Sequence, residues 1–263
     1  MAGVKQLTII IFTDRADRIF HQSLLSAAIA EQLIIFDQET SNDWPALKKE
    51  LLAINPDLKI RIIPRQGPIT DFAKLRNQAI KLVKTQWLLF LDSDEILELP
   101  SLNYLKNLLQ SKAVVAYTIT RYDYFAHHQL RFGETGGYQA IRLAKTNSIS
   151  YRRPVHERAF VKGLVRESDL VIKHFSHKNI SQFFSDVSYY AKLEAEFRDH
   201  EQAISKTALI LQTLIFPGAK FIYNYILCWG VLDGFAGLIY AVLMSGHSLL
   251  VRILLYEQLF IQS

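Results

Sequence analysis

The stretch Trp87–Glu95 constrains this chain more than any other, because an unbroken apolar run in it is followed at once by acids. The run Trp87–Leu91 has the length of a strand that is buried on both faces, as in a parallel sheet. In open α/β sheets, ligands bind just beyond the carboxyl ends of such strands. Asp92, Asp94 and Glu95 lie there, and clustered carboxylate oxygens suit Mg²⁺ or Mn²⁺. The sequence therefore predicts a ligand site at this strand end, and a solvated acidic strand end is the alternative.

Apolar segments of strand length alternate with helical patterns along the rest of the first half. Strands are predicted at Leu7–Thr13, Gln32–Phe36 and Lys59–Ile63, and helices at Ala16–Ala30, Trp44–Ile54 and Pro100–Gln110. Further strands are predicted at Ala113–Tyr122 and Asp169–Lys173. This alternation is typical of an α/β fold with right-handed crossovers.

A helix is predicted over residues 70–84, and Arg76 falls inside its apolar stripe. An arginine on a packed helix face needs an anionic partner. One interpretation is a buried ion pair with an acid at the sheet end. The other is a contact with a phosphate or with the acids that hold a metal.

Composition excludes several classes of protein. The net charge of +5 is modest, and the basic residues are not interleaved with aromatic ones, so we expect no nucleic-acid partner. The single cysteine, Cys228, rules out an internal disulfide and fits a reducing compartment. The apolar segment after Met1–Gln6 is too short for a secretory signal and is predicted to be a strand.

Two motifs within this α/β pattern resemble those of a known family. Phe72–Ala73, followed after two residues by Arg76–Asn77–Gln78–Ala79, precedes Trp87–Leu88–Leu89–Phe90–Leu91–Asp92–Ser93–Asp94–Glu95. The combination resembles the family 2 glycosyltransferases of GT-A fold, and most closely the lipopolysaccharide-core β-1,4-glucosyltransferases, with Ser93 where they have alanine. The resemblance implies a Rossmann-like nucleotide-diphospho-sugar transferase fold, with a mixed sheet flanked by helices.

The same resemblance implies roles for individual residues. The donor, a UDP-hexose, would be bound by Thr13, Asp37, Arg76, Asn77, Asp92 and Ser93. The divalent cation, Mg²⁺ or Mn²⁺, would be held by Asp92, Asp94 and His174. Glu157, in the segment Val155–His156–Glu157, would be the general base.

Glu157 also stands out by its surroundings. Arg152, Arg153 and Arg158 flank it, and such charges keep a carboxylate ionised. A surface charge cluster would explain these residues equally well. Glu134, in the glycine-containing loop 133–138, is the next candidate for the base.

Composition changes after about residue 206, so we expect a catalytic domain over residues 1–205 and an apolar helical segment over residues 206–263. Pro217–Gly218 is expected to break the first apolar stretch, and Phe221–Met244 is nearly all apolar. Asp233 lies in its middle between Gly230 and Gly234, where an acid in a spanning helix would cost about 2.5–3.5 kcal/mol. This predicts a helical hairpin with Asp233 capping its second helix, inserted into one leaflet. A hairpin buried against the catalytic domain or a second subunit is the alternative.

Together these features predict an inverting, metal-dependent glycosyltransferase, peripheral or monotopic on the cytoplasmic face of the cell membrane. Its partners would be a nucleotide-sugar donor, a lipid-linked or cell-envelope glycan acceptor, the membrane surface, and other copies of the chain through the C-terminal helices. One alternative is a phosphatase of the haloacid dehalogenase type with Asp92 as nucleophile. Another is a non-catalytic membrane protein that binds nucleotide sugars.

Overall fold

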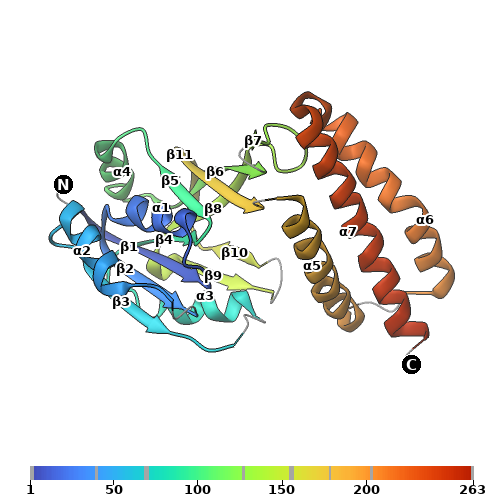
Figure 1. Cartoon of the computed structure of the whole chain (residues 1–263). Helices are drawn as coiled ribbons and strands as arrows, with labels where there is room; N and C mark the ends of the chain where they lie inside the picture. The colour runs from blue at the N-terminus through green and yellow to red at the C-terminus, as the bar shows by residue number, and fades with distance from the viewer. Residues whose placement is uncertain are drawn as a thin grey trace. The chain divides into compact units, whose positions relative to one another are not determined.

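Strand β4 (Trp87–Asp92) contains the apolar run that precedes the acids. It lies inside a nine-stranded sheet of order β3-β2-β1-β4-β8-β6-β11-β5, with β7 paired to β6. This is seen in a computed structural model that describes residues 3–38, 41–67, 71–125, 128–153, 157–177, 179–201 and 204–261 (Figure 1). The other strands of the sheet are β1 (Val4–Thr13), β2 (Ala30–Asp37), β3 (Lys59–Pro64), β5 (Glu95–Glu98), β6 (Val114–Phe125), β7 (His128–Gln129), β8 (Tyr138–Lys145) and β11 (Leu164–His177).

The sheet is mixed, as predicted. Strands β1, β2, β3 and β4 pair in parallel, whereas β8 runs antiparallel to β4 and β5 runs antiparallel to β11. All five apolar residues of β4 are fully buried, so the prediction of a strand covered on both faces is confirmed. Register places the carboxyl ends of β1, β2 and β4 side by side, because Thr13 pairs with Asp37 and Phe12 pairs with Asp92.

The helices of the first half begin at acidic or hydroxyl caps. They are α1 (Arg18–Ala27), α2 (Trp44–Ile54), α3 (Phe72–Ile80) and α4 (Leu102–Leu109). Asp17, Asp43, Asp71 and Ser101 each accept a hydrogen bond from the backbone N–H three residues later. The predicted helix over residues 16–30 was too long, because Asp17 starts α1 and the chain has already entered β2 at Ala30.

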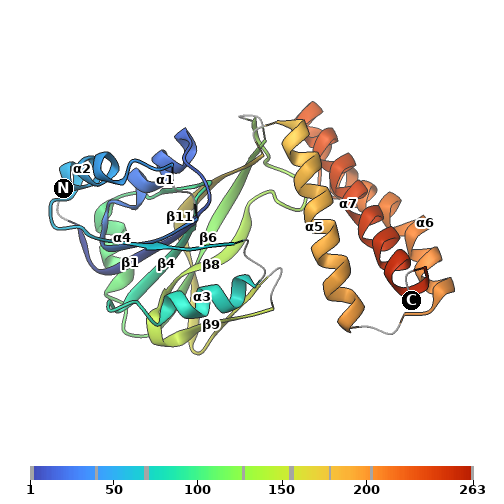
Figure 2. The ribbon, with the colours of Figure 1, turned by 60° about the horizontal axis from the view of Figure 1, so that its bottom comes forward.

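Apolar side chains form a layer on each face of the sheet. One layer joins alternate residues of β1, such as Ile9 and Ile11, to α1, α2 and α4. The other joins Ile10 and Phe12 to α3 and to β9 (Ile149–Arg152). Strand β9 forms a separate two-stranded sheet with β10 (Arg158–Val161), and α3 lies beside it (Figure 2). Burial on both faces of the main sheet is what keeps its strand ends in a fixed arrangement.

The C-terminal part is helical. It contains α5 (Ile180–Glu201), α6 (Lys206–Ile222), a π-helical turn Tyr223–Leu227, a 3₁₀ turn Gly230–Asp233, and α7 (Gly234–Phe260), against which α5 and α6 pack (Figures 1 and 2). The predicted apolar hairpin is therefore present as α6 and α7.

Two details of the predicted hairpin were wrong. Pro217 lies inside α6 and does not end it, because a proline removes only one helical hydrogen bond and α6 is held along its length by packing on α7. Ser245 of α7 also donates a hydrogen bond of 2.5 Å to the carbonyl oxygen of Pro217. Asp233 does not cap α7 with its side chain, which instead accepts hydrogen bonds from the backbone N–H groups of Arg131 and Phe132 at 2.9–3.1 Å.

The turn between the two helices of the hairpin is tight. A Cβ atom on Gly237 would lie 2.0 Å from the carbonyl oxygen of Gly230, and one on Gly230 would lie 2.5 Å from the carbonyl oxygen of Asn224. Such distances exclude any side chain. Glycines at these two places let α7 start directly against the turn.

Residues group into two compact units by their contacts. One unit comprises residues 1–121 and 139–174, and the other comprises residues 122–138 and 175–263. This grouping assigns α5 and the loop 133–138 to the same unit as the hairpin. The predicted boundary after residue 205, between a catalytic domain and an apolar helical segment, stays a prediction.

Candidate active site

Three of the predicted donor-binding residues lie where parallel strands end. Thr13 ends β1, Asp37 ends β2 and Asp92 ends β4, on adjacent strands. The Thr13 hydroxyl accepts from the backbone N–H of Arg15 at 3.1 Å and so shapes the turn after β1. This edge is where ligands of α/β proteins bind.

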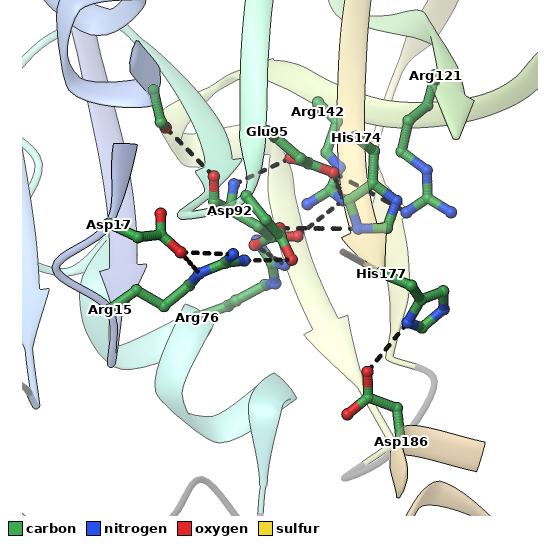
Figure 3. Close-up of polar contacts among 12 residues, drawn as sticks. Arg15, Asp17, Arg76, Asp92, Glu95, Arg121, Arg142, His174, His177 and Asp186 are labelled. Carbon is green, nitrogen blue, oxygen red and sulfur yellow. Dashed lines mark hydrogen bonds and ion pairs between the residues drawn. The ribbon is translucent and has the colours of Figure 1, made fainter. Parts of the chain in front are cut away.

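Asp92 lies between two buried arginines (Figure 3). Arg76 Nη2 donates to Asp92 Oδ1 and Arg142 Nη2 donates to Asp92 Oδ2, both at 3.0 Å. Burial alone would raise the pKa of Asp92, but the Arg142 and Arg76 guanidinium groups hold this pKa well below its ordinary value. Asp92 is therefore a carboxylate across the physiological pH range, with both oxygen atoms engaged by cations.

Glu95 closes the turn after β4. Its Oε2 atom accepts from the Asp92 backbone N–H at 2.9 Å, and its Oε1 atom accepts from Arg142 Nη2 at 2.9 Å. The side chain is 0% exposed, and burial raises the pKa of its carboxyl, an effect that Arg142 opposes. Glu95 is thus an internal brace of the acidic turn.

Asp94 points to the predicted histidine. Asp94 Oδ1 lies 3.7 Å from His174 Nε2, and Asp94 Oδ2 lies 3.3 Å from Arg15 Nη1. The other terminal nitrogen of this guanidinium, Arg15 Nη2, lies 2.8 Å from Asp17 Oδ2 (Figure 3). Among the described residues, no group of three His, Cys, Asp or Glu side chains is arranged to hold a metal ion. Asp94 and His174 together offer two ligands, which fits a cation whose other ligands come from water and phosphate oxygens.

Arg76 lies on α3 and contacts two acids. Besides Asp92, its Nε atom donates to Glu157 Oε1 at 3.0 Å. The first interpretation from the sequence, an ion pair with an acid at the sheet end, is therefore correct in the structure. The structure thereby links Asp92, a predicted donor-side residue, to Glu157, the predicted base.

The remaining predicted residues have the following surroundings. Asn77 exchanges two hydrogen bonds with the backbone of Tyr151. Asp37 accepts from the indole N–H of Trp44 at 2.7 Å, and Ser93 is buried in the turn after β4. The roles assigned to these side chains by resemblance stay predictions. Val155 and His156 lie outside the described residues.

Sequence reasoning missed Arg142, Arg15 and the bracing role of Glu95. Arg142 sits between apolar residues in β8 and reaches the site only because β8 lies antiparallel beside β4. An arginine inside an apolar strand is a signal that a buried acid is near. Its partner could not be named without the order of the strands.

The other compact unit has a polar cluster of its own. Glu134 contacts Lys220 through an ion pair and Tyr240 through a hydrogen bond of 3.3 Å, and its backbone N–H donates to Asn224 at 3.0 Å. Gly133 adopts a positive φ of 76°, which the loop requires. Glu134 is thus held by the helical hairpin of its own unit.

A cavity of about 460 Å³ lies beside α3. Its lining includes Lys74, Asn77, Lys81, Arg152 and Arg153, and none of Asp92, Asp94, Glu157 or His174. The cavity is therefore distinct from the cluster of acids at the strand ends.

The chain is similar to proteins of a known family. A family model described as glycosyl transferase family 2 matches residues 17–169. No protein in a search of curated sequences matches the chain.

The chain is also similar to solved structures of other proteins. The mannosyltransferase PcManGT from Pyrobaculum calidifontis, in complex with GDP-Man and Mn²⁺, is 13% identical with a TM-score of 0.49, covering 100% of this chain and 90% of that one. S. aureus TarS 1–349 in complex with UDP is 12% identical with a TM-score of 0.44, covering 96% and 90%. Glucosyl-3-phosphoglycerate synthase from Mycobacterium tuberculosis, in complex with Mn²⁺, UDP and phosphoglyceric acid, is 12% identical with a TM-score of 0.35, covering 54% and 56%.

Proposed function

This chain belongs to glycosyl transferase family 2, and from that premise we propose that it is an inverting, metal-dependent glycosyltransferase. It transfers a sugar from a UDP-hexose to a lipid-linked or cell-envelope glycan. The observation that carries the proposal is the acidic turn after β4, where Asp92 and Asp94 lie beside His174 and two arginines at the carboxyl edge of the sheet. A fixed group of charges at this edge suits a diphosphate and its cation.

The donor assignment is supported by three strand ends. Thr13, Asp37 and Asp92 occupy one edge of the parallel part of the sheet, and Ser93 follows in the same turn. The nucleoside would lie along this edge, with the Asp37 carboxylate toward the base. Arg15, held by Asp17, offers a guanidinium near Asp94 that suits phosphate oxygens.

Asp94 and His174 are the residues that would hold the cation. Their facing atoms are 3.7 Å apart, and both carboxylate oxygen and imidazole nitrogen are ligands for Mn²⁺, while Mg²⁺ prefers the oxygen. Asp92 would serve as a further ligand, because each of its carboxylate oxygens accepts one bond from an arginine and keeps a second lone pair for a cation. A bound cation supplies neutralisation of the charge that develops on the departing diphosphate.

Glu157 is the proposed general base. An acceptor hydroxyl is a weak nucleophile until its proton is removed. The Glu157 carboxylate takes that proton as the hydroxyl oxygen bonds to the anomeric carbon and the bond from that carbon to the diphosphate oxygen breaks. A single displacement from the opposite face inverts the configuration at the anomeric carbon.

The hairpin supports attachment to a membrane. Its exposed side chains include Leu214, Leu232 and Phe235, whose exposed fractions are 74%, 62% and 73%. Residues 230–260 form a helical stretch that is long and apolar enough to cross a membrane, and an 18-residue window within it has a mean hydropathy of 1.8. Large exposed apolar surfaces mark a protein or membrane contact. We place the protein on the cytoplasmic face, where a lipid-linked acceptor would be presented beside the hairpin, and association between copies through the same helices is also expected.

A screen of nucleotide sugars by thermal unfolding tests the function. A ligand that binds only the folded state raises the apparent stability as its concentration increases. We expect UDP-hexoses to raise the unfolding temperature in the presence of Mn²⁺ and much less with a chelator. The Asp94→Ala variant should lose this metal-dependent part of the shift. A wild-type shift that is the same in Mn²⁺ and in chelator would contradict the metal assignment.

Activity is then measured with a radiolabelled donor and a membrane lipid extract as acceptor. Transfer of label into lipid would distinguish an enzyme from a non-catalytic binding protein. Trapping of a phosphorylated Asp92 would instead support the phosphatase alternative.

A further inference from the structure

We propose that Arg76 and Asn77 are positioning residues that clamp the segment carrying Glu157 against α3, and that neither is a donor ligand. The proposal deepens the proposed function, on which it rests for the role of Glu157 as base. It reassigns two residues for which the family resemblance implies donor binding. The observations that carry it are the contacts of two consecutive side chains on α3.

Arg76 is enclosed on every side that the structure describes. The residue is 3% exposed, and its guanidinium carbon lies 4.7 Å from the ring centre of Phe90, 5.4 Å from that of Tyr151 and 5.7 Å from that of Phe12. Such rings stabilise a buried cation through their negative faces. With so little of the residue exposed, a nucleotide could contact this guanidinium only if a neighbouring side chain moved.

The same guanidinium joins two acids with different proposed roles. Its Nε atom binds Glu157 and its Nη2 atom binds Asp92, each at 3.0 Å. A guanidinium is a rigid planar fork, so two hydrogen bonds from one fork fix their acceptors relative to each other. Arg76 therefore sets the position of the acceptor-side base relative to the donor-side acid.

Asn77 holds the backbone of the same segment. Its Nδ2 atom donates to the carbonyl oxygen of Tyr151 at 2.8 Å, and its Oδ1 atom accepts from the Tyr151 N–H at 2.9 Å. This two-bond pairing resembles the contact between neighbouring strands. Tyr151 in turn pairs with Ala159 and Arg152 pairs with Arg158, the residue after Glu157. Asn77 thus anchors the hairpin from which Glu157 projects.

Positioning of this kind affects the rate of reaction more than the binding of the donor. A misplacement of about 1 Å in a reacting group can reduce a rate by about 10²-fold. Donor affinity should change little, because the donor-side carboxylate Asp92 keeps its second arginine, Arg142.

The test compares two clamp variants with one matched control. Asn77→Ala removes both bonds to Tyr151, and Arg76→Lys keeps the charge but removes the fork. Gln78→Ala is a change at an exposed neighbour on α3. For each folded variant, UDP affinity with Mn²⁺ is measured by calorimetry, and transfer is measured from radiolabelled UDP-glucose to a membrane lipid extract.

We expect Asn77→Ala and Arg76→Lys to lower the transfer rate by roughly 10–100-fold, with less than about threefold change in UDP affinity. Gln78→Ala should change neither quantity. A loss of UDP affinity as large as the loss of transfer in both clamp variants would make these residues donor ligands and overturn the proposal.

Hydrogen exchange supplies a readout that is independent of the reaction. In Asn77→Ala, amide exchange in residues 149–161 should accelerate relative to wild type and Gln78→Ala, because the Tyr151 N–H loses its acceptor. Unchanged exchange there would overturn the clamp even if transfer is lost. If the wild type neither binds UDP nor transfers sugar, the proposed function fails, while the exchange result still decides whether the clamp exists.

Discussion

Removal of the Arg142 guanidinium provides a demanding test of the acidic turn. In Arg142→Met, Asp92 keeps Arg76 as a partner, but Glu95 loses the donor that lies 2.9 Å from its Oε1 atom. Arg121 remains near Glu95 only at 3.9 Å. The variant therefore leaves a fully buried carboxyl with weak compensation.

The expected loss in the free energy of unfolding follows from the burial of Glu95. Breaking a buried ion pair by removing one partner costs about 3–5 kcal/mol. The remaining partners of both acids place the expected loss near the lower end, at about 3 kcal/mol. For a chain of this size, this corresponds to a decrease in unfolding temperature of roughly 6–12 °C at neutral pH.

The stability deficit of Arg142→Met should depend on pH in a defined direction. Burial already places the folded-state pKa of Glu95 above its unfolded-state value, and loss of Arg142 moves it further upward. A carboxyl with a raised folded-state pKa makes the folded state less stable at high pH, and this penalty disappears as pH falls through that folded-state pKa. The deficit of Arg142→Met relative to wild type should therefore be smaller at pH 5 than at pH 7.

The assay is thermal unfolding of the full chain in detergent, followed by circular dichroism at both pH values. The double variant Arg142→Met/Glu95→Gln should recover most of the loss, because an amide removes the buried charge and its oxygen can still accept from the Asp92 N–H. An unfolding temperature of Arg142→Met within about 2 °C of wild type at pH 7 would refute the reasoning, since a shift of that size corresponds to less than about 1 kcal/mol. So would a double variant no more stable than the single one.

Two further predictions concern catalysis and the membrane. Glu157→Gln should lower transfer by roughly 10²–10⁴-fold with donor affinity nearly unchanged, and an equal loss in His156→Gln with full activity of Glu157→Gln would move the base to the histidine. Replacing Leu214, Leu232 and Phe235 together by glutamate should reduce co-sedimentation with phospholipid vesicles, because these exposed side chains have few packing partners to lose. Unchanged sedimentation of this folded variant would place the membrane contact elsewhere.

The sequence by itself determined the architecture and the position of the acidic turn at the end of a buried strand. The apolar run of β4 followed by Asp92, Asp94 and Glu95 reports burial on both faces and a strand end, because both follow from local composition. The span of α2 agrees with its predicted bounds, since its proline and its acidic cap act within the first turn. The apolar hairpin was equally visible from composition.

Only the tertiary structure decided which groups pair with each other in ion pairs and hydrogen bonds. Arg76 is buried between Asp92 and Glu157, residues 16 and 81 positions away, and no local pattern specifies such pairings. Asp233 was expected to cap α7, yet it binds backbone N–H groups about 100 residues earlier, because the loop 131–136 packs there. Burial of a charge or of a backbone N–H group demands a partner, but the order of the strands and the packing of the hairpin choose which one.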